Sequence, residues 1–336
     1  MSQPNNSLSD LLSRRGRLVA DGGMGTSLFE LGLQAGATPE LWNVEHPELV
    51  AKVHTGFVNA GADVILTNTF GGTRARLDLD GLGDRIVELN RAGVKVALDV
   101  AASSSREVIV AGSVGPTGLL FEPMGPLDHA AAVELFAEQI RALADAGAQV
   151  IWVETLSAIE ELAAAVEAGG LVDPPVVTTM SFDSHGSTMM GVPPADLVGW
   201  WGSSGVVPAA IGANCGIGPA DVVVAVSEIH AENRELVVVA KGNCGIPQIV
   251  DGSLWYPTST DDMTAYAELA IDAGARIIGA CCGSVPSHIE QIREALDNYD
   301  VVRPFDFDEV VRRLGETARS RTTPKRERRG RSRVSS

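Results

Sequence analysis

The sequence predicts an α/β fold in which eight strands, each followed by a helix, close into a single barrel. Its 336 residues suffice for such a barrel, which needs about 250 residues, and leave room for extensions. The hydrophobic content of 45% and the charged content of 21% are near the globular average and exclude a chain that is disordered or fibrous throughout. Short β-branched runs alternate with Ala-, Leu- and Glu-rich stretches typical of helices. Eight such alternations favour a (β/α)8 TIM barrel over an open doubly wound sheet.

The expected strands are runs of mostly apolar residues. In chain order they cover residues 17–23, 62–70, 107–115, 149–155, 175–182, 208–215, 235–244 and 276–282. Because the runs are largely continuous in apolar residues, both faces of each strand are expected to be covered, as in a parallel sheet. Three runs follow the tripeptide Ala-Gly-Ala, at 60–62, 146–148 and 273–275, which indicates a helix end, a glycine cap and a tight turn into the next strand.

The barrel is expected to occupy residues 17–300, between an N-terminal extension of residues 1–16 and a C-terminal extension of residues 301–315. Residues 316–336 form a basic tail with eight Lys or Arg and two Asp or Glu. Because it has few apolar residues to bury, this tail is expected to be disordered and solvated. The alternatives are an electrostatic tether to RNA or to an acidic protein, and a contact with the chain's own acidic body.

The net charge of −17 at pH 7 disfavours nucleic acid and anionic membranes as main partners. No segment has the run of about 20 apolar residues that spans a membrane, and the first residues lack the apolar stretch of a secretory signal. We therefore expect a cytoplasmic protein. Four cysteines are too few for a disulfide scaffold. The sequence does not indicate an oligomeric state.

Polar residues and all four cysteines gather at the ends of the expected strands. These residues are Asp21, Asn68, Glu154, Asn214, Cys215, Asn243, Cys244, Cys281 and Cys282. In a barrel of this type the loops after the strands share one opening, and catalytic residues lie there. The sequence therefore predicts one site at the C-terminal ends of the strands.

The cysteines are the most informative members of this group. Cys281 and Cys282 are adjacent at the end of one run, and Cys215 closes another. Three thiolates that converge from two loops would form a zinc site with an open fourth position, which is the catalytic type. The alternative is three buried free cysteines or a disulfide between the adjacent pair. Cys244 is interpreted as a residue that packs at the opening or behind the ligands, with a spare ligand as the alternative.

Glu154 follows three apolar residues at the end of an expected strand. A carboxylate in such a place is costly unless it binds a cation, so we expect it to hold a substrate ammonium group. A salt bridge to Arg74 or Arg76 is the alternative.

The glycine-rich turn at residues 21–28 leads into an expected helix. Its free amides at Gly22, Gly23 and Met24 could receive a carboxylate, as helix N-termini do. The alternative is a tight turn that needs glycine for a positive φ.

Eight segments together resemble the homocysteine S-methyltransferase family. They are DGGMGT, EHPELV, GADVILTNTF, AGSVGPTG, VETLSAIEE, GVPP, GANCGIGP and GACCGSVPSHI, in family order from Asp21 to Ile289. The family includes the homocysteine-binding barrel of cobalamin-dependent methionine synthase, betaine–homocysteine methyltransferase and the S-methylmethionine-dependent enzymes. The pairing of NC at one strand end with CCG near the end of the barrel is the specific feature.

The resemblance implies a set of site residues. Cys215, Cys281 and Cys282 would bind zinc, and Glu154 would hold the amino group of homocysteine. The turn at Asp21, Gly22 and Gly23 would receive the substrate carboxylate, and Asn68 and Asn214 would line the same pocket. The implied activity is a zinc-dependent methyl transfer to L-homocysteine that forms methionine.

The sequence indicates the methyl acceptor more clearly than it indicates the methyl donor. Three zinc-bound thiolates make the site negative, which favours a small cationic donor such as glycine betaine or a related onium compound. Gly71 stands where the animal betaine enzymes have a tyrosine, and Cys244 stands where methionine synthases usually have alanine. The chain also ends where methionine synthases continue into folate and cobalamin modules, so a separate methylated corrinoid protein is the alternative donor. A hypothesis of another class is a zinc- or thiol-binding protein without catalysis.

Overall fold

The computed structural model describes residues 7–250 and 253–319, and its central feature is a ring of eight parallel strands. The strands are β1 (Leu18–Val19), β2 (Val64–Leu66), β3 (Ile109–Val114), β4 (Val150–Leu156), β5 (Val176–Met180), β6 (Ala210–Cys215), β7 (Val238–Gly242) and β10 (Ala275–Ala280). Neighbours pair in the order β1-β10-β7-β6-β5-β4-β3-β2. A parallel bridge between Ala20 and Val64 joins the two ends of this order. The chain is therefore a (β/α)8 TIM barrel, as predicted, and all eight strands lie within the expected runs or within one residue of them.

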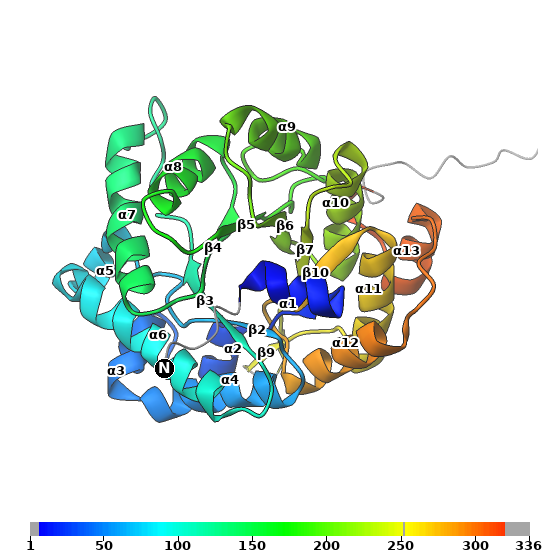
Figure 1. Cartoon of the computed structure of the whole chain (residues 1–336), viewed down its shortest axis with the longest axis horizontal. Coiled ribbons are helices and arrows are strands. Elements are labelled where there is room, and N and C mark those ends of the chain that lie inside the picture. The colour runs from blue at the N-terminus through cyan, green and yellow to red at the C-terminus, as the bar shows by residue number, and fades with distance from the viewer. Residues whose placement is uncertain (1–6, 251–252, 320–336) are drawn as a thin grey trace, which may run out of the picture.

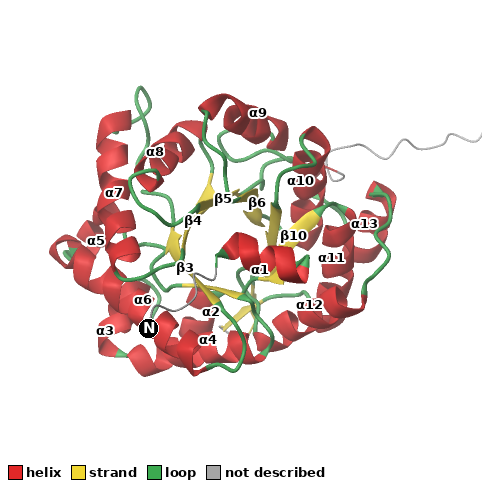
Figure 2. Cartoon of the chain, viewed as in Figure 1, coloured by secondary structure: helices red, strands yellow, loops and turns green. Residues whose placement is uncertain are grey.

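Helices surround the strands on the outside (Figures 1 and 2). The longer ones are α4 (Pro47–Asn59), α6 (Ile86–Ser103), α7 (His129–Asp145), α8 (Ile159–Gly169), α9 (Pro194–Ser204), α10 (Pro219–Glu232), α11 (Thr260–Asp272) and α12 (Pro286–Asn298). Shorter elements are the α-helices α2 (Met24–Glu30), α3 (Trp42–Glu45) and α5 (Arg74–Leu77) and the 3-10 helices η1 (Pro39–Leu41), η2 (Asp78–Asp80) and η3 (Gly83–Arg85). Local sequence fixes several starts: Asp128 caps α7 by accepting from the Ala131 amide, and proline begins α4, α10 and α12.

The Ala-Gly-Ala tripeptides behave as expected. Gly61, Gly147 and Gly274 have φ values of 102°, 101° and 98°, a conformation that L side chains rarely adopt. Each glycine lies between the end of a helix and the start of the next strand, at β2, β4 and β10. These turns set the angle at which the chain re-enters the barrel.

The strands bury both of their faces. Side chains such as Val19 and Ile65 pack outward against the helices. Leu18, Ile109 and Trp152 point into the barrel, where they form a second core with Leu8, Leu11 and Leu12 of helix α1 (Leu8–Arg15). Figure 1 shows α1 lying across the barrel, and its contacts with the first residues of the strands place it at the N-terminal end, opposite the strand ends that carry the cysteines. The described part of the N-terminal extension is therefore an integral part of the barrel core.

The C-terminal extension also packs on the barrel. Helix α13 (Phe307–Leu314) lies against α10 and α11, and its Val310 is buried. Beyond it, Ala318 is buried and its amide donates to Asp221 Oδ1 at 2.8 Å. Arg319 pairs with Glu228 of α10 and donates to the Gly186 carbonyl at 3.1 Å.

The structure thereby corrects the boundary expected at residue 316. Residues 317–319 of the predicted tail pack against α10, because this helix offers acidic partners for the amide of Ala318 and for the Arg319 guanidinium. The remaining part of the predicted disordered tail, residues 320–336, lies outside the described residues.

A two-stranded antiparallel sheet, β8 (Gln248–Val250) and β9 (Ser253–Trp255), lies in the loop after β7 and has no counterpart among the expected strands. Among the described residues, no helix combines the length and apolar character needed to cross a membrane.

Candidate metal and substrate site

The C-terminal ends of the strands surround a cavity of about 420 Å³. Its walls come from seven of the eight strand ends, so the opening collects residues far apart in the sequence. The expected site residues that line it are Asp21, Gly22, Gly23, Asn68, Glu154, Cys215, Cys281 and Cys282. Eight of the expected site residues therefore meet at one cavity at this end of the barrel.

Cys215, Cys281 and Cys282 form a compact cluster of free thiols. Their Sγ atoms all lie within 4.8 Å of one another, and those of Cys215 and Cys281 are 3.0 Å apart. Cys215 ends β6 with a φ of 57°. Gly283 turns the chain after Cys282 with a φ of 79°. These two left-handed residues bring sulfurs from different loops to one point.

Asn243 holds the two cysteine loops together. Its Oδ1 accepts from the Cys282 amide at 2.9 Å, and its Nδ2 donates to the Gly216 carbonyl at 2.9 Å. The Cys281 amide in turn donates to the Gly242 carbonyl at 2.8 Å. These contacts join the loops that carry the sulfurs and fix where the sulfurs lie.

The cluster fits a soft divalent cation. A tetrahedral zinc ion with Zn–S bonds of about 2.3 Å places its sulfur ligands roughly 3.8 Å apart, between the 3.0 Å of the one close pair and the 4.8 Å limit of the cluster. Hydrogen bonds from Cys215 and Cys281 lower the pKa of Cys282, whereas hydrogen bonds from Cys281 and Cys282 raise the pKa of Cys215 well above its usual range. Thiolates this close together repel one another, and a bound cation would offset that repulsion.

Cys244 does not belong to this cluster. Its side chain is fully buried, with Sγ 3.7 Å from His288 Nδ1. Its amide donates to the Cys282 carbonyl at 3.0 Å. Cys244 therefore packs behind the loop of Cys281 and Cys282, outside the group of clustered sulfurs.

Glu154 faces the cavity from the end of β4. It is only 8% exposed, and its Oε1 accepts a hydrogen bond of 2.6 Å from Ser113 Oγ. Burial raises its pKa to about 7, with Lys241 acting in the opposite direction. The alternative salt bridge to Arg74 is wrong, because Arg74 pairs with Glu138. Arg76 lines the same cavity, but no ion pair joins it to Glu154 among the described residues.

Asp21 is paired within the protein. Its Oδ1 accepts from Lys241 Nζ at 2.8 Å, and its Oδ2 accepts from the Leu66 amide at 2.7 Å. Lys241 Nζ also lies 5.8 Å from the centre of the Trp152 ring. Burial disfavours the charge of Lys241, but the carboxylates of Asp21 and Glu154 outweigh it and raise its pKa. Sequence reasoning missed Lys241, although a single lysine at the end of an apolar strand was a visible signal.

The glycine turn is shaped by space and not by positive φ. A Cβ on Gly22 would lie 2.4 Å from Ser284 Oγ, and one on Gly23 would lie 2.8 Å from the Cys281 carbonyl oxygen. Gly23 has a φ of −74°, so the expected need for a left-handed conformation is wrong there. The Gly23 amide donates to Ser284 Oγ at 2.9 Å and is already used within the protein.

The two asparagines also bind protein groups. Asn68 lines the cavity, but its Nδ2 donates to the Pro39 carbonyl at 2.7 Å and to Asn43 Oδ1 at 3.0 Å. Asn214 is fully buried and is not among the lining residues, which corrects the expectation that it lines the pocket. It instead accepts hydrogen bonds from the Thr155 amide and from the Thr179 hydroxyl, and so stabilises the end of β4.

Comparisons of the sequence and of the structure with known proteins point to one enzyme family. A sequence model of the family described as homocysteine S-methyltransferase matches residues 18–296. Methionine synthase from Mycobacterium tuberculosis is 30% identical over 312 residues, and that from Mycobacterium leprae is 27% identical over 312 residues. These matches cover 87% and 88% of the chain but 25% of either relative, so the chain spans about a quarter of the length of these methionine synthases.

Among solved structures, the metallated form of the homocysteine methyltransferase MmuM from Escherichia coli superposes with a TM-score of 0.72 and 26% identity. That match covers 86% of this chain and 99% of MmuM. The family match extends from the first strand to the last helix of the barrel and includes the three clustered cysteines. The chain therefore belongs to the homocysteine S-methyltransferase family of enzymes.

Proposed function

We propose that this protein transfers a methyl group to the sulfur of L-homocysteine and forms methionine, with zinc held by Cys215, Cys281 and Cys282. The observation that carries the proposal is the convergence of three free thiols beside a buried carboxylate in one cavity. Soft thiolate ligands in this number are typical of a catalytic zinc site. The relation to MmuM, whose metallated form is known, supports the same metal-binding role.

Bound zinc would act as a Lewis acid that favours the thiolate form of the substrate thiol. The chain's own residues then orient the amino acid. Glu154 binds the substrate ammonium group through the carboxylate oxygen that Ser113 does not occupy. Because the cavity excludes most solvent around Glu154, this contact is stronger than it would be in water. Holding the amino acid at one end fixes the line along which sulfur, methyl carbon and leaving group must align.

We further propose a small cationic donor, with glycine betaine or a related onium compound as the favoured class. The carboxylates of Asp21, Glu40, Asp80 and Glu154 line the cavity, against the cations Arg76 and Lys241. Phe70 adds an aromatic side chain to the outer wall, and aromatic faces attract quaternary ammonium groups. In the reaction, a bond forms between sulfur and the methyl carbon while the bond from that carbon to the onium atom breaks. The electron pair stays with the leaving group, and the thiol proton goes to solvent.

A methylated corrinoid on another protein is the second candidate donor, because the methionine synthases are among the relatives. The test is methionine formation by the purified, zinc-loaded protein. Betaine, dimethylsulfoniopropionate and S-methylmethionine would be compared with a methylcorrinoid carrier. Turnover with an onium donor alone supports the favoured class, whereas turnover with only the corrinoid carrier would replace it.

A non-catalytic zinc- or thiol-binding role predicts a different result. Such a protein would bind zinc but form no methionine with any donor, and L-homocysteine would not raise its unfolding temperature. A ligand of the folded state must raise that temperature. Thermal unfolding with and without L-homocysteine therefore separates the two functions before a donor is known.

A further inference from the structure

Lys241 is a buried cation at the inner wall of the cavity. It lies near the end of β7, and its side chain is 3% exposed. An ammonium group has three N–H donors, of which the salt bridge with Asp21 uses one. Its side chain borders the same cavity as the three thiols and Glu154. The site therefore presents a carboxylate and an ammonium group to one bound molecule.

Homocysteine carries the complementary pair of charges. Its α-amino group is a cation and its α-carboxylate is an anion, and a buried carboxylate is costly unless a donor or cation meets it. The backbone turn offers less than the sequence suggested, because the Gly23 amide already donates to Ser284. A lysine within the cavity supplies a charge-assisted hydrogen bond to a carboxylate, which is stronger than a bond from a neutral amide.

We propose that Lys241 binds the α-carboxylate of homocysteine while Glu154 binds its α-amino group, so that the two residues select an α-amino acid among small thiols. This inference rests on the proposed function. Asp21, which accepts from both Lys241 and the Leu66 amide, is then a positioning residue that fixes the direction of the Lys241 side chain. Lys241 thereby determines specificity for the amino acid portion of the substrate, separately from the thiol cluster.

The test uses two truncated substrates. 3-Aminopropane-1-thiol lacks the carboxylate of homocysteine, and 4-sulfanylbutanoate lacks its amino group. The wild-type protein should prefer L-homocysteine over both in kcat/KM. Lys241→Met should lose about 10- to 100-fold in kcat/KM with L-homocysteine, the range for a hydrogen bond to a charged group. It should lose little with 3-aminopropane-1-thiol, so that its preference between these two thiols disappears.

Glu154→Gln is the matched variant for the other end of the substrate. It should lose its preference for L-homocysteine over 4-sulfanylbutanoate and keep the preference over 3-aminopropane-1-thiol. Because Lys241→Met leaves Asp21 buried without its partner, the double variant Asp21→Asn/Lys241→Met, which removes both charges, is measured beside it. Lys241→Arg should retain part of the preference, because it keeps the charge.

Binding is measured independently of methyl transfer, as the calorimetric affinity of each zinc-loaded variant for L-homocysteine without a donor, with zinc content determined for each. An unchanged preference in both variants that lack Lys241 would overturn the proposal and assign the carboxylate to the amides of residues 22–24. An equal loss with all three thiols would also overturn it and reduce Lys241 to a partner of Asp21. Failure of the proposed function is a separate result, in which the wild-type protein neither binds nor methylates L-homocysteine.

Discussion

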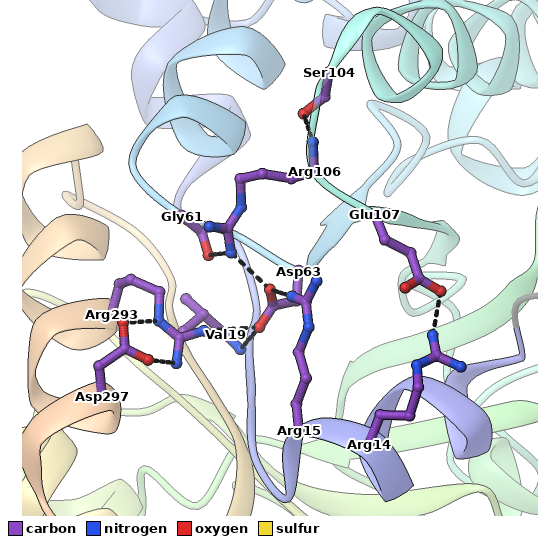
Figure 3. A network of polar contacts seen from close by, with 10 residues as sticks. All are labelled: Arg14, Arg15, Val19, Gly61, Asp63, Ser104, Arg106, Glu107, Arg293 and Asp297. Atoms are coloured by element: carbon purple, nitrogen blue, oxygen red, sulfur yellow. Dashed lines mark hydrogen bonds and ion pairs between the residues drawn. The ribbon is translucent and has the colours of Figure 1, made fainter.

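At the N-terminal end of the barrel, the carboxylate of Asp63 is enclosed by cations from three separate elements (Figure 3). Arg15 at the end of α1, Arg106 before β3 and Arg293 of α12 all pair with it, the last two at 3.0 Å. The Val19 amide adds a fourth donor at 2.9 Å. Asp63 is fully buried, and the guanidinium groups around it exceed its own charge.

The C-terminal end buries its charges with fewer partners. Asp21 has one cationic partner, Lys241, and Glu154 is hydrogen-bonded to the neutral hydroxyl of Ser113. The three thiols have only one another within hydrogen-bonding reach of their sulfurs among the described contacts. A charge that its own fold compensates stabilises the fold, whereas a charge left undercompensated in a cavity is available to a ligand. This difference indicates that the charges at the N-terminal end of the barrel stabilise the fold, whereas those at the C-terminal end are available for ligand binding.

The largest expected effect tests the C-terminal end of the barrel, where the three thiols lie. Cys282→Ala should abolish methionine formation and reduce zinc content to a small fraction of one ion per chain, since a two-thiolate site no longer fits the ion. Metal analysis and turnover on the same preparation measure both. Cys244→Ala is the matched control, because this cysteine packs behind the cluster, and it should keep its zinc. Stoichiometric zinc in Cys282→Ala would show that the ligand assignment is wrong.

The next effect tests the N-terminal end of the barrel, where Asp63 lies. Asp63→Ala leaves three guanidinium groups facing one another. Removing one partner of a buried ion pair costs about 3–5 kcal/mol of unfolding free energy, and the partial exposure of these arginines places the expected loss near the lower value. Chemical denaturation measures this loss. Zinc content and KM for homocysteine should stay at the wild-type values, and a change in either would contradict the separation of the two ends.

A smaller effect concerns the pH dependence of activity at the C-terminal end of the barrel. The pKa of Glu154 is raised by burial to about 7, with Lys241 lowering it and Cys281 and Asp21 raising it further. Only the ionised carboxylate binds the substrate ammonium, so kcat/KM with homocysteine should rise as pH increases through about 7. Glu154→Gln should lower kcat/KM by about 10- to 100-fold and remove this step, leaving only the ionisations of substrate and thiols. An identical pH profile in the variant would refute the role of Glu154.

The raised pKa of Glu154 also affects stability, and its effect on stability has the opposite pH dependence to its effect on activity. Because the folded-state pKa of Glu154 lies above its usual value of 4.5, the folded protein binds more protons than the unfolded chain between about pH 4.5 and pH 7. The contribution of Glu154 to the unfolding free energy therefore decreases as pH rises through this interval. Glu154→Gln should flatten that part of the stability profile in thermal unfolding, while activity and stability of the wild type change in opposite directions.

The sequence predicted the barrel well because the fold depends on local patterns that repeat. Apolar runs, glycine caps and strand ends are visible one segment at a time. The strand ends place the three cysteines at one end of the barrel, and the family resemblance adds their expected convergence. Lys241 and Asn214 were not predicted in their observed roles, because each depends on which side chains meet across the barrel. A lysine near the end of β7 gains its partner from the turn after β1, and an asparagine before Cys215 gains its partners from β4 and β5. Residues 317–319 were misjudged for the same reason, since their partners lie on α10.

The smallest effect examines Asn214, which links the two cavity walls that carry Glu154 and Cys215. Its Oδ1 accepts from the Thr155 amide at 2.9 Å and from Thr179 Oγ1 at 2.7 Å, and its Nδ2 donates to Thr155 Oγ1 at 2.7 Å. Thr155 has a φ of 65°, which costs about 1–3 kcal/mol for a residue other than glycine. The amide of Asn214 therefore holds a strained irregularity of β4 directly after Glu154.

Asn214→Ala should release this strained part of β4 and displace Glu154. We expect KM for homocysteine to rise by about 10-fold, since each lost hydrogen bond contributes about 1 kcal/mol, while kcat changes less and zinc content is retained. Thr179→Val is the matched control, because it removes one of the three bonds and leaves both bonds to Thr155 in place. It should therefore raise KM less than Asn214→Ala does. Equal KM values in the two variants would mean that Asn214 supports only the fold and does not position Glu154.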